Sequence, residues 1–212
     1  MTQPWTVVVP VKRLAAAKTR LRGGLPGVPH QELALALAAD TLAAVQDCPG
    51  VAEVLVVTDD ARVAGVARSG GARVLPDVAA GLNAAFRHGA ADAAGWVAGL
   101  TADLPALRPA ELAAALHAAL TGPPGVRRFV TDAPGTGTVL LAAPPGVPLD
   151  PRFGPGSAAA HAASGARPLT GGWPSLRRDV DTADDLAAAA RLGLGPRTTS
   201  LAAGCLTESF ST

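Results

Sequence analysis

Residues 5–12 read Trp5-Thr6-Val7-Val8-Val9-Pro10-Val11-Lys12, a short run rich in valine that ends in a lysine. Such a run is typical of a strand with both faces buried in a parallel sheet. The loop that follows, up to Gly24, holds both lysines of the protein, Lys12 and Lys18, whereas the other sixteen Lys or Arg positions are arginines. An ammonium group meets a phosphate as a compact point charge, so the loop indicates a polyphosphate site, with a solvated basic loop as the alternative.

The composition of the chain limits its possible functions. It has 212 residues, 49% of them hydrophobic, which fits one domain with a sizeable core. The net charge of +1 is too balanced for a general nucleic-acid or membrane-surface binder. Cys48 and Cys205 are far apart and have no metal-finger spacing, and neither a signal-peptide pattern nor a membrane-length apolar run is visible. We therefore expect a cytoplasmic protein with no nucleic-acid or membrane partner.

Strand and helix patterns alternate along the first half of the chain, which predicts an α/β fold with right-handed crossovers. The expected strands are 6–9, 53–57, 72–75 and 96–100, and the expected helices are 30–47, 61–68, 84–94 and 109–120. Later segments predict strands at 128–131, 139–142 and 176–180 and helices at 157–164 and 183–191. The tight turn before 139–142 indicates one antiparallel strand. We predict a single Rossmann-like three-layer αβα domain over residues 1–196 and a flexible tail over 197–212.

Carboxylates stand at predicted strand ends, where ligands bind in parallel sheets. Asp103 follows the strand 96–100, and Asp179 and Asp181 point the same way on an extended segment. Carboxylates there are suited to Mg²⁺, which takes one or two of them together with substrate phosphates and water. Asp181 has an alternative role as part of an Asp-Thr helix cap.

Two turns rich in small residues offer backbone N–H and hydroxyl groups to an anion: Gly135-Thr136-Gly137-Thr138, and Phe153-Gly154-Pro155-Gly156-Ser157 at a helix start. Gly81-Leu82-Asn83 precedes a helix and is either a cap or a contact to a nucleotide. The chain lacks GxGxxG after the first strand and lacks GxxxxGK[ST], which disfavours dinucleotide binding and Walker-type NTPases. The four histidines lie singly on predicted helices, where structural roles are commoner than catalytic ones.

Taken together, these residues resemble the guanylyltransferases of coenzyme F-420 biosynthesis, which act on phosphoenolpyruvate or 2-phospho-L-lactate. The resemblance spans about residues 6–190. It rests on motifs that occur in the family's order, namely Val9-Pro10-Val11-Lys12, Ala17–Leu21, Gly81-Leu82-Asn83, Ala102-Asp103-Leu104-Pro105, Asp132 with Gly135–Thr138, Phe153-Gly154 with Ser157 and His161, and Asp179–Thr182.

The resemblance implies a nucleotide-diphospho-sugar-transferase-like fold and a reaction of GTP with a phosphorylated three-carbon acid that releases pyrophosphate. It implies that Asp103, Asp179 and Asp181 hold Mg²⁺ and that Thr138, Gly154 and Ser157 bind phosphoenolpyruvate. The product would pass to a downstream transferase that adds it to a deazaflavin.

From the chemistry we hypothesise that Lys12, Lys18 and Arg20 hold the GTP phosphates as catalytic cations, because phosphoryl chemistry needs positioning and charge neutralisation more than a base. For base or ribose contacts the candidates are Asp59, Asp60, Asp77 and Asn83.

The arginine- and alanine-rich composition indicates a GC-rich bacterium such as an actinobacterium, and the resemblance implies that family members of such bacteria act on phosphoenolpyruvate. The alternatives are 2-phospho-L-lactate as acceptor, another nucleotidyltransferase such as a molybdenum-cofactor guanylyltransferase, and a non-catalytic nucleotide-binding module. The absence of a glycine-rich loop directly after the first strand disfavours the second of these, and the lysines together with the three aspartates disfavour the third.

Overall fold

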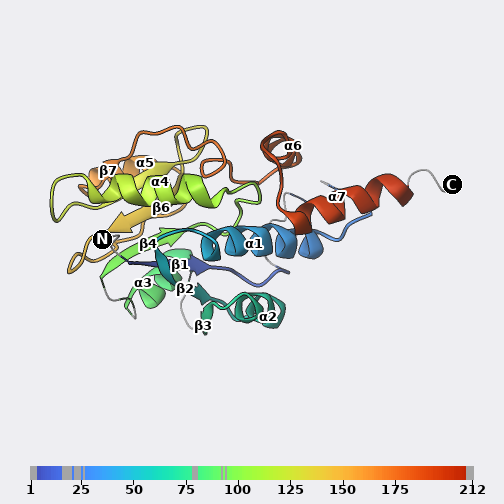
Figure 1. The fold of residues 1–212 in the computed structure, drawn as a ribbon, viewed down its shortest axis with the longest axis horizontal. Coiled ribbons are helices and arrows are strands. Elements are labelled where there is room, and N and C mark those ends of the chain that lie inside the picture. Colours follow the sequence, from blue (N-terminus) through green and yellow to red (C-terminus); the bar gives the residue numbers. More distant parts are fainter. Residues whose placement is uncertain are drawn as a thin grey trace.

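A computed structural model describes residues 4–15, 21, 25, 27–77, 81–91, 93 and 95–208, the last five without their side chains. Seven strands form one mixed sheet in the order β3-β2-β1-β4-β6-β5-β7, with helices on both faces (Figure 1). The predicted αβα architecture is confirmed. No helix in the described ranges is long and apolar enough to cross a membrane.

The strands and helices have the following bounds. The strands are β1 (Trp5–Pro10), β2 (Val51–Val57), β3 (Arg73–Leu75), β4 (Trp96–Leu100), β5 (Arg128–Thr131), β6 (Thr138–Ala143) and β7 (Arg167–Pro168). The helices are α1 (His30–Gln46), α2 (Ala61–Ser69), α3 (Leu82–Ala91), α4 (Pro109–Leu120), α5 (Ser157–Ala163), α6 (Ala183–Leu192) and α7 (Pro196–Glu208).

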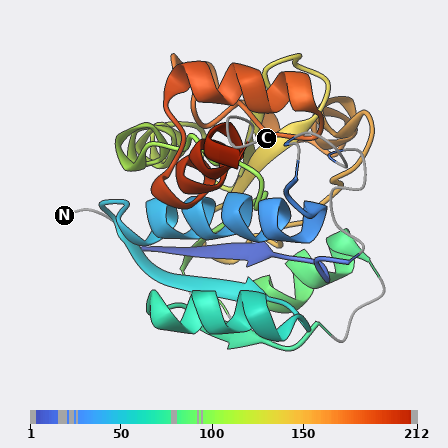
Figure 2. The same cartoon turned by 90° about the vertical axis from the view of Figure 1, so that its right-hand side faces the viewer.

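Strand β1 lies inside the sheet, and all six of its residues are buried. It pairs in parallel with β2 on one side and β4 on the other. Because strand side chains alternate between faces, Val7 and Val9 join the core beneath α1 and α4, while Val8 packs in a second core with Phe86 of α3. Figure 2 shows α1 lying along β1. Burial on both faces explains the unbroken valine run.

Strand β6 runs against the other strands of the sheet. It is antiparallel to both β4 and β5, and Thr131 at the end of β5 lies opposite Thr138 at the start of β6. The first residue of β6 therefore lies at the same edge as the carboxyl ends of β1, β2, β4 and β5. This confirms the single antiparallel strand that the tight turn predicts.

The predicted strand at 176–180 is wrong. This segment is a turn followed by irregular chain, and the last strand is instead the two-residue β7, which pairs with β5. The apolar Leu176 and Val180 are both fully buried, so they imitate a strand pattern while anchoring a loop. Glu111 of α4 holds that loop, because its carboxylate accepts hydrogen bonds from the backbone N–H and the hydroxyl of Ser175 (2.8 and 2.7 Å).

The tail predicted over 197–212 was expected to be aperiodic, but its residues up to 208 lie in the helix α7. The beginning of this helix packs against α1, and the helix then extends away from it (Figure 1). The buried carboxylate of Asp40 on α1 accepts the backbone N–H groups of Arg197 (3.0 Å) and Thr198 (2.8 Å). A Cβ at Gly195 would lie 2.4 Å from Cγ of Asp40, so this approach requires glycine. Because the cap comes from a residue far away in sequence, local periodicity does not reveal it.

We predict that Asp40→Ala lowers the free energy of unfolding by about 1–3 kcal/mol, because it leaves two N–H groups at the start of α7 without their acceptor, one of them the buried N–H of Thr198. Chemical denaturation measures the loss, and hydrogen exchange should show the first turn of α7 opening. The matched control is Asp47→Ala, which removes an exposed carboxylate beyond the end of the same helix. Equal stability of the two variants would contradict this account of how α7 is attached.

Candidate functional site

The predicted polar residues gather at the edge of the sheet where β1, β2, β4 and β5 end and β6 begins. Lys12 follows β1 and is exposed, and the preceding Val11 donates its N–H to Val57 O at the end of β2 (2.9 Å). Asp103 follows β4. Lys18 and Arg20 lie outside the described residues, so the cationic loop is placed only at its beginning.

The loop after β2 fastens the start of the basic loop. Asp60 accepts the N–H of Leu14 (3.0 Å) with one oxygen, and with the other it caps α2 through the N–H groups of Arg62 and Val63. Burial raises the pKa of Asp60, but these three N–H groups outweigh it and hold the pKa below 3.8. Asp59 forms an ion pair with Arg13. Both carboxylates therefore have structural partners within the protein, and their contact with a nucleotide stays a prediction.

The segment that carries Asp179 and Asp181 lies against the end of β4. The backbone N–H of Val180 donates to Asp103 O (3.0 Å), so the two predicted metal-binding segments run side by side. The predicted Asp-Thr cap is present in part, because Thr182 caps α6 and Asp185 completes a reciprocal capping box. Asp181 takes part through its backbone N–H, which donates to the carboxylate of Asp185 (3.3 Å).

The three aspartates do not form a ready-made metal cage. No group of three His, Cys, Asp or Glu side chains within the described ranges is placed to hold a metal ion. Asp103 and Asp179 are each half-buried, while Asp181 is exposed. This donor set fits an ion such as Mg²⁺, which needs only one or two carboxylates when phosphates and water complete its shell.

The residues predicted to bind the phosphorylated acid come together around α5. Ser157 and His161 lie one turn apart on that helix and both are buried. Thr138 Oγ1 lies 2.9 Å from Nδ1 of His161. Gly154 O accepts the N–H of Ser157 (3.1 Å). The structure thus brings Thr138, Gly154 and Ser157 into one small region, and their binding role stays a prediction.

Two side chains hold the turns that border this region. Asp132 accepts the N–H groups of Thr136 (2.9 Å) and Gly137 (2.8 Å), which shapes the turn before β6. Asn83 lies in the first turn of α3, and its amide exchanges two hydrogen bonds with the backbone of Phe153 (2.7 and 3.0 Å). The predicted nucleotide contact of Asn83 therefore has a structural partner already. Gly154 has φ +136°, a conformation that favours glycine.

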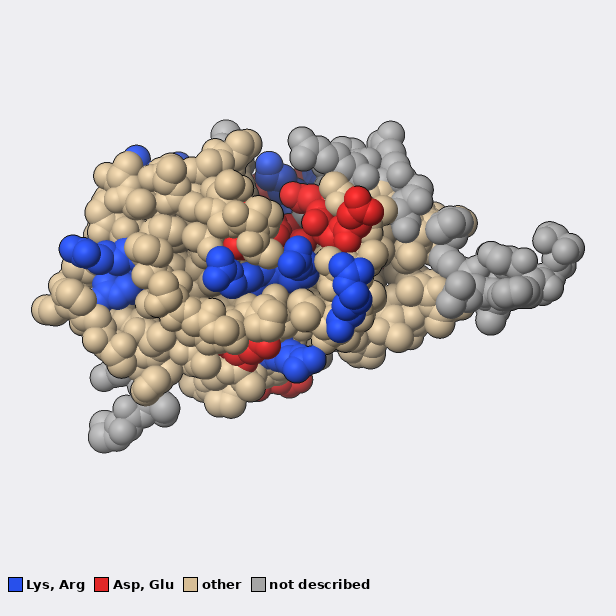
Figure 3. All heavy atoms as spheres, turned by 90° about the horizontal axis from the view of Figure 1, so that it is seen from above, with Lys and Arg blue, Asp and Glu red and all other residues tan. Residues whose placement is uncertain are grey.

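A basic cavity of about 330 Å³ lies between α6 and the segment before Asp179. Three arginines line it, Arg177, Arg178 and Arg191, together with apolar atoms of Ala133 and Leu192. Arg177 also donates to Thr131 Oγ1 (2.6 Å) at the end of β5. Figure 3 shows basic side chains in a row beside a group of acidic ones on the face that carries α6. Clusters of guanidinium groups are suited to binding carboxylates or phosphates.

The sequence from residue 5 to residue 143 matches the family described as "Guanylyl transferase CofC like". The chain belongs to this guanylyltransferase family. A protein of Salinispora arenicola named phosphoenolpyruvate guanylyltransferase is 76% identical over 200 residues, which are 93% of each chain. A protein of the same name from Geodermatophilus obscurus is 56% identical over 207 residues, 94% of each chain.

Solved structures share the fold of this CofC-like guanylyltransferase at low sequence identity. A protein of Desulfovibrio desulfuricans described as a nucleotide-diphospho-sugar transferase has a TM-score of 0.64 at 16% identity and covers 98% of this chain and 95% of its own. A cytidylyltransferase of Leptospira borgpetersenii has a TM-score of 0.59 at 14% identity, with the same coverage. They confirm the predicted nucleotide-diphospho-sugar-transferase-like fold.

In this CofC-like protein, sequence reasoning missed the basic cavity and the anchoring side chains. The pair Arg177-Arg178 directly before Asp179 was a usable signal. No sequence signal pointed to Arg191, because only the fold brings α6 next to the segment that carries Arg177 and Arg178. Likewise His161 looked structural as a lone helical histidine, and Asp132 and Asn83 act through backbone groups that a sequence pattern does not show.

We predict that Asp60→Ala lowers the free energy of unfolding at pH 7 by about 0.5–2 kcal/mol, the usual effect of removing a helix cap. The pKa of Asp60 is lower in the folded chain, so its contribution is complete above pH 3.8 and is lost as the pH falls through the lower folded value. The difference between wild type and variant should therefore shrink in acid, which denaturation at several pH values measures.

Asp59→Ala is the control, because the exposed Asp59–Arg13 pair contributes little to stability. A stability difference for Asp60→Ala that stays constant far below pH 3.8 would contradict the charged cap.

Proposed function

We propose that this chain transfers GMP from GTP to phosphoenolpyruvate, forming enolpyruvyl-diphospho-guanosine and pyrophosphate. The observation that carries the proposal is its 76% identity, over 93% of both chains, to a relative named phosphoenolpyruvate guanylyltransferase. The fold supports it, because Lys12 and Thr138, which we assign to the two anionic substrates, lie at the same edge of the sheet. The chain would act in the cytoplasm as a step of coenzyme F-420 biosynthesis, and the buried free thiol of Cys48 is consistent with a reducing compartment.

The proposed reaction is an in-line displacement at the α-phosphorus of GTP. A phosphate oxygen of the acid forms the new P–O bond, and the bond from the α-phosphorus to pyrophosphate breaks. The attacking phosphate is already an anion, so no side-chain base is required. The protein must place two negatively charged substrates together and offset their repulsion.

The residues divide between these tasks by position. Lys12, with Lys18 and Arg20 of the same loop, would neutralise the phosphates of GTP beside the ends of β1 and β2. Thr138, Gly154 and Ser157 would hold the phosphorylated acid next to β6. Asp103 and Asp179, with Asp181 at the rim, would hold Mg²⁺, which when bound offsets charge on the phosphates that meet there.

The first experiment measures pyrophosphate release from GTP and Mg²⁺ with phosphoenolpyruvate, with 2-phospho-L-lactate and with neither acid. The downstream deazaflavin transferase and its acceptor are added in a parallel set, because they draw off the product. We expect release with phosphoenolpyruvate alone. Release only with 2-phospho-L-lactate would change the acceptor, and none with either acid in a folded chain that binds GTP would contradict the proposed activity.

We predict that Lys18→Ala and Asp103→Asn each lower kcat/KM by about 100-fold or more, because each removes a charge proposed to act on the reacting phosphates. The melting temperature should change little. The matched controls are Arg68→Ala at the exposed end of α2 and Asp47→Asn beyond α1, which remove charges of the same sign elsewhere. Near-normal turnover of either test variant would remove that residue from the proposed site.

A further inference from the structure

His161 has no exposed surface, and it is the only buried histidine in the described part of the chain. It lies on α5, one turn after Ser157, and its ring contacts Phe153 edge-on at 5.2 Å and Phe129 at 5.8 Å between ring centroids. Both ring nitrogens are engaged. Nε2 lies 2.9 Å from the backbone N of Arg152, and Nδ1 lies 2.9 Å from Thr138 Oγ1.

The neighbours of His161 determine where its proton lies. A backbone N–H can only donate, so Nε2 must accept from Arg152 and carries no proton. The pKa of His161 is lowered to about 4, chiefly by burial and also by the charges of Arg152 and Arg127, while Asp150 and the backbone of Ser157 act in the opposite direction. The ring is therefore neutral at pH 7, with its single proton on Nδ1.

The position of that proton sets the direction of the hydrogen bond to Thr138. Nδ1–H donates and Oγ1 accepts, so one lone pair of the hydroxyl is used and its own hydrogen remains available to another acceptor. Both ionic groups of a phosphorylated acid are acceptors. With the opposite tautomer, the hydroxyl would donate to His161 and would present only lone pairs to an anion.

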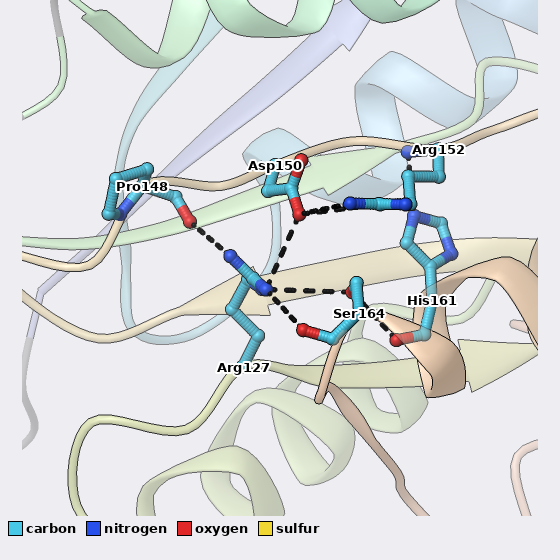
Figure 4. A network of polar contacts seen from close by, with 6 residues as sticks. All are labelled: Arg127, Pro148, Asp150, Arg152, His161 and Ser164. Atoms are coloured by element: carbon cyan, nitrogen blue, oxygen red, sulfur yellow. Dashed lines mark hydrogen bonds and ion pairs between the residues drawn. The ribbon is translucent and has the colours of Figure 1, made fainter.

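A rigid frame keeps the ring in this orientation. Arg127 donates to Pro148 O (3.1 Å) and to Ser164 O (2.8 Å) and forms an ion pair with Asp150, which also pairs with Arg152 (Figure 4). The loop before α5 is thus held on both sides of Asp150. The backbone N–H of Arg152 can then meet Nε2 without a change in the loop.

We propose that His161 is a positioning residue for the acceptor acid, which holds the hydroxyl of Thr138 as a hydrogen-bond donor to the anionic substrate. This inference rests on the proposed function, in which Thr138 binds the phosphorylated acid. It assigns His161 no role in proton transfer. The hydroxyl then donates a charge-assisted hydrogen bond in a buried setting, where such bonds are strongest.

Two variants of the full chain separate this role from mere support of the loop. Asn in place of His161 can put an amide N–H near the position of Nδ1 and so keeps the donor to Thr138. Gln can put its carbonyl oxygen near the position of Nε2, and so keeps the acceptor for Arg152 but leaves Thr138 without a donor. Initial rates of pyrophosphate release give kcat and the KM for each substrate.

We expect His161→Gln to raise the KM for phosphoenolpyruvate by about 10-fold or more, the scale of a lost hydrogen bond to a charged group, with the KM for GTP unchanged. His161→Asn should stay closer to wild type. In a Thr138→Val background, His161→Gln should cause no further change, because the group through which it acts is gone. Equal KM values for the two variants, or a larger effect of His161→Asn, would overturn the proposal.

A measurement on the wild-type chain decides the matter if the variants fold poorly. The ¹⁵N shifts of the imidazole nitrogens at pH 7 should report a neutral ring with the proton on Nδ1. A proton on Nε2 would overturn the inference whether or not the chain is active. Absence of acid-dependent pyrophosphate release from the wild type, with the proton on Nδ1, would instead refute the proposed function and remove the substrate role of Thr138 with it.

Discussion

The antiparallel placement of β6 between β4 and β5 is the constraint on which the candidate site depends. In a fully parallel sheet, the first residue of a strand lies at the edge opposite to the ligand-binding edge. The reversed direction of β6 puts its first residue, Thr138, beside the carboxyl ends of β4 and β5. It also leaves only six residues to join β5 to β6. The carboxylate of Asp132 can then organise the whole connection through two backbone N–H groups.

The carboxylates with structural roles are different residues from those proposed to hold a metal ion. Asp40, Asp60, Glu111 and Asp132 accept hydrogen bonds from backbone N–H groups and fasten loops or helix ends. Asp103 and Asp179 lie where β4 meets the segment before α6, next to the residues proposed for the two substrates. Helix α6 is capped by Thr182 together with Asp185.

The sequence was informative wherever the cause of a structure is local. The valine run of β1, the proline start of α4 and the turn before β6 each carry their own signal, and their predicted bounds differ from the observed ones by at most a residue or two. It misled where burial has a distant cause. Leu176 and Val180 are buried by packing rather than by pairing in the sheet, and α7 begins where Asp40, more than 150 residues earlier, provides its acceptor.

The same distinction between local and distant causes applies to the candidate site. Its polar residues could be placed at one edge of the sheet from motif order alone, because strand ends in such a fold share an edge. The pairing of Thr138 with His161 and the engagement of Asn83 with Phe153 could not, since both join segments whose separation is set by tertiary packing.

The acceptor side of the proposed site is built from one continuous stretch of chain, from Asp132 through the turn, β6, the loop before α5 and the first turns of α5. Lys12 and Asp103, proposed to act on the nucleotide and its metal ion, come from segments that precede this stretch. A single exchanged segment, or a few changes within it, can therefore alter which acid is recognised while the nucleotide half stays intact. Such modularity gives evolution a direct route from one phosphorylated acceptor to another on an unchanged scaffold.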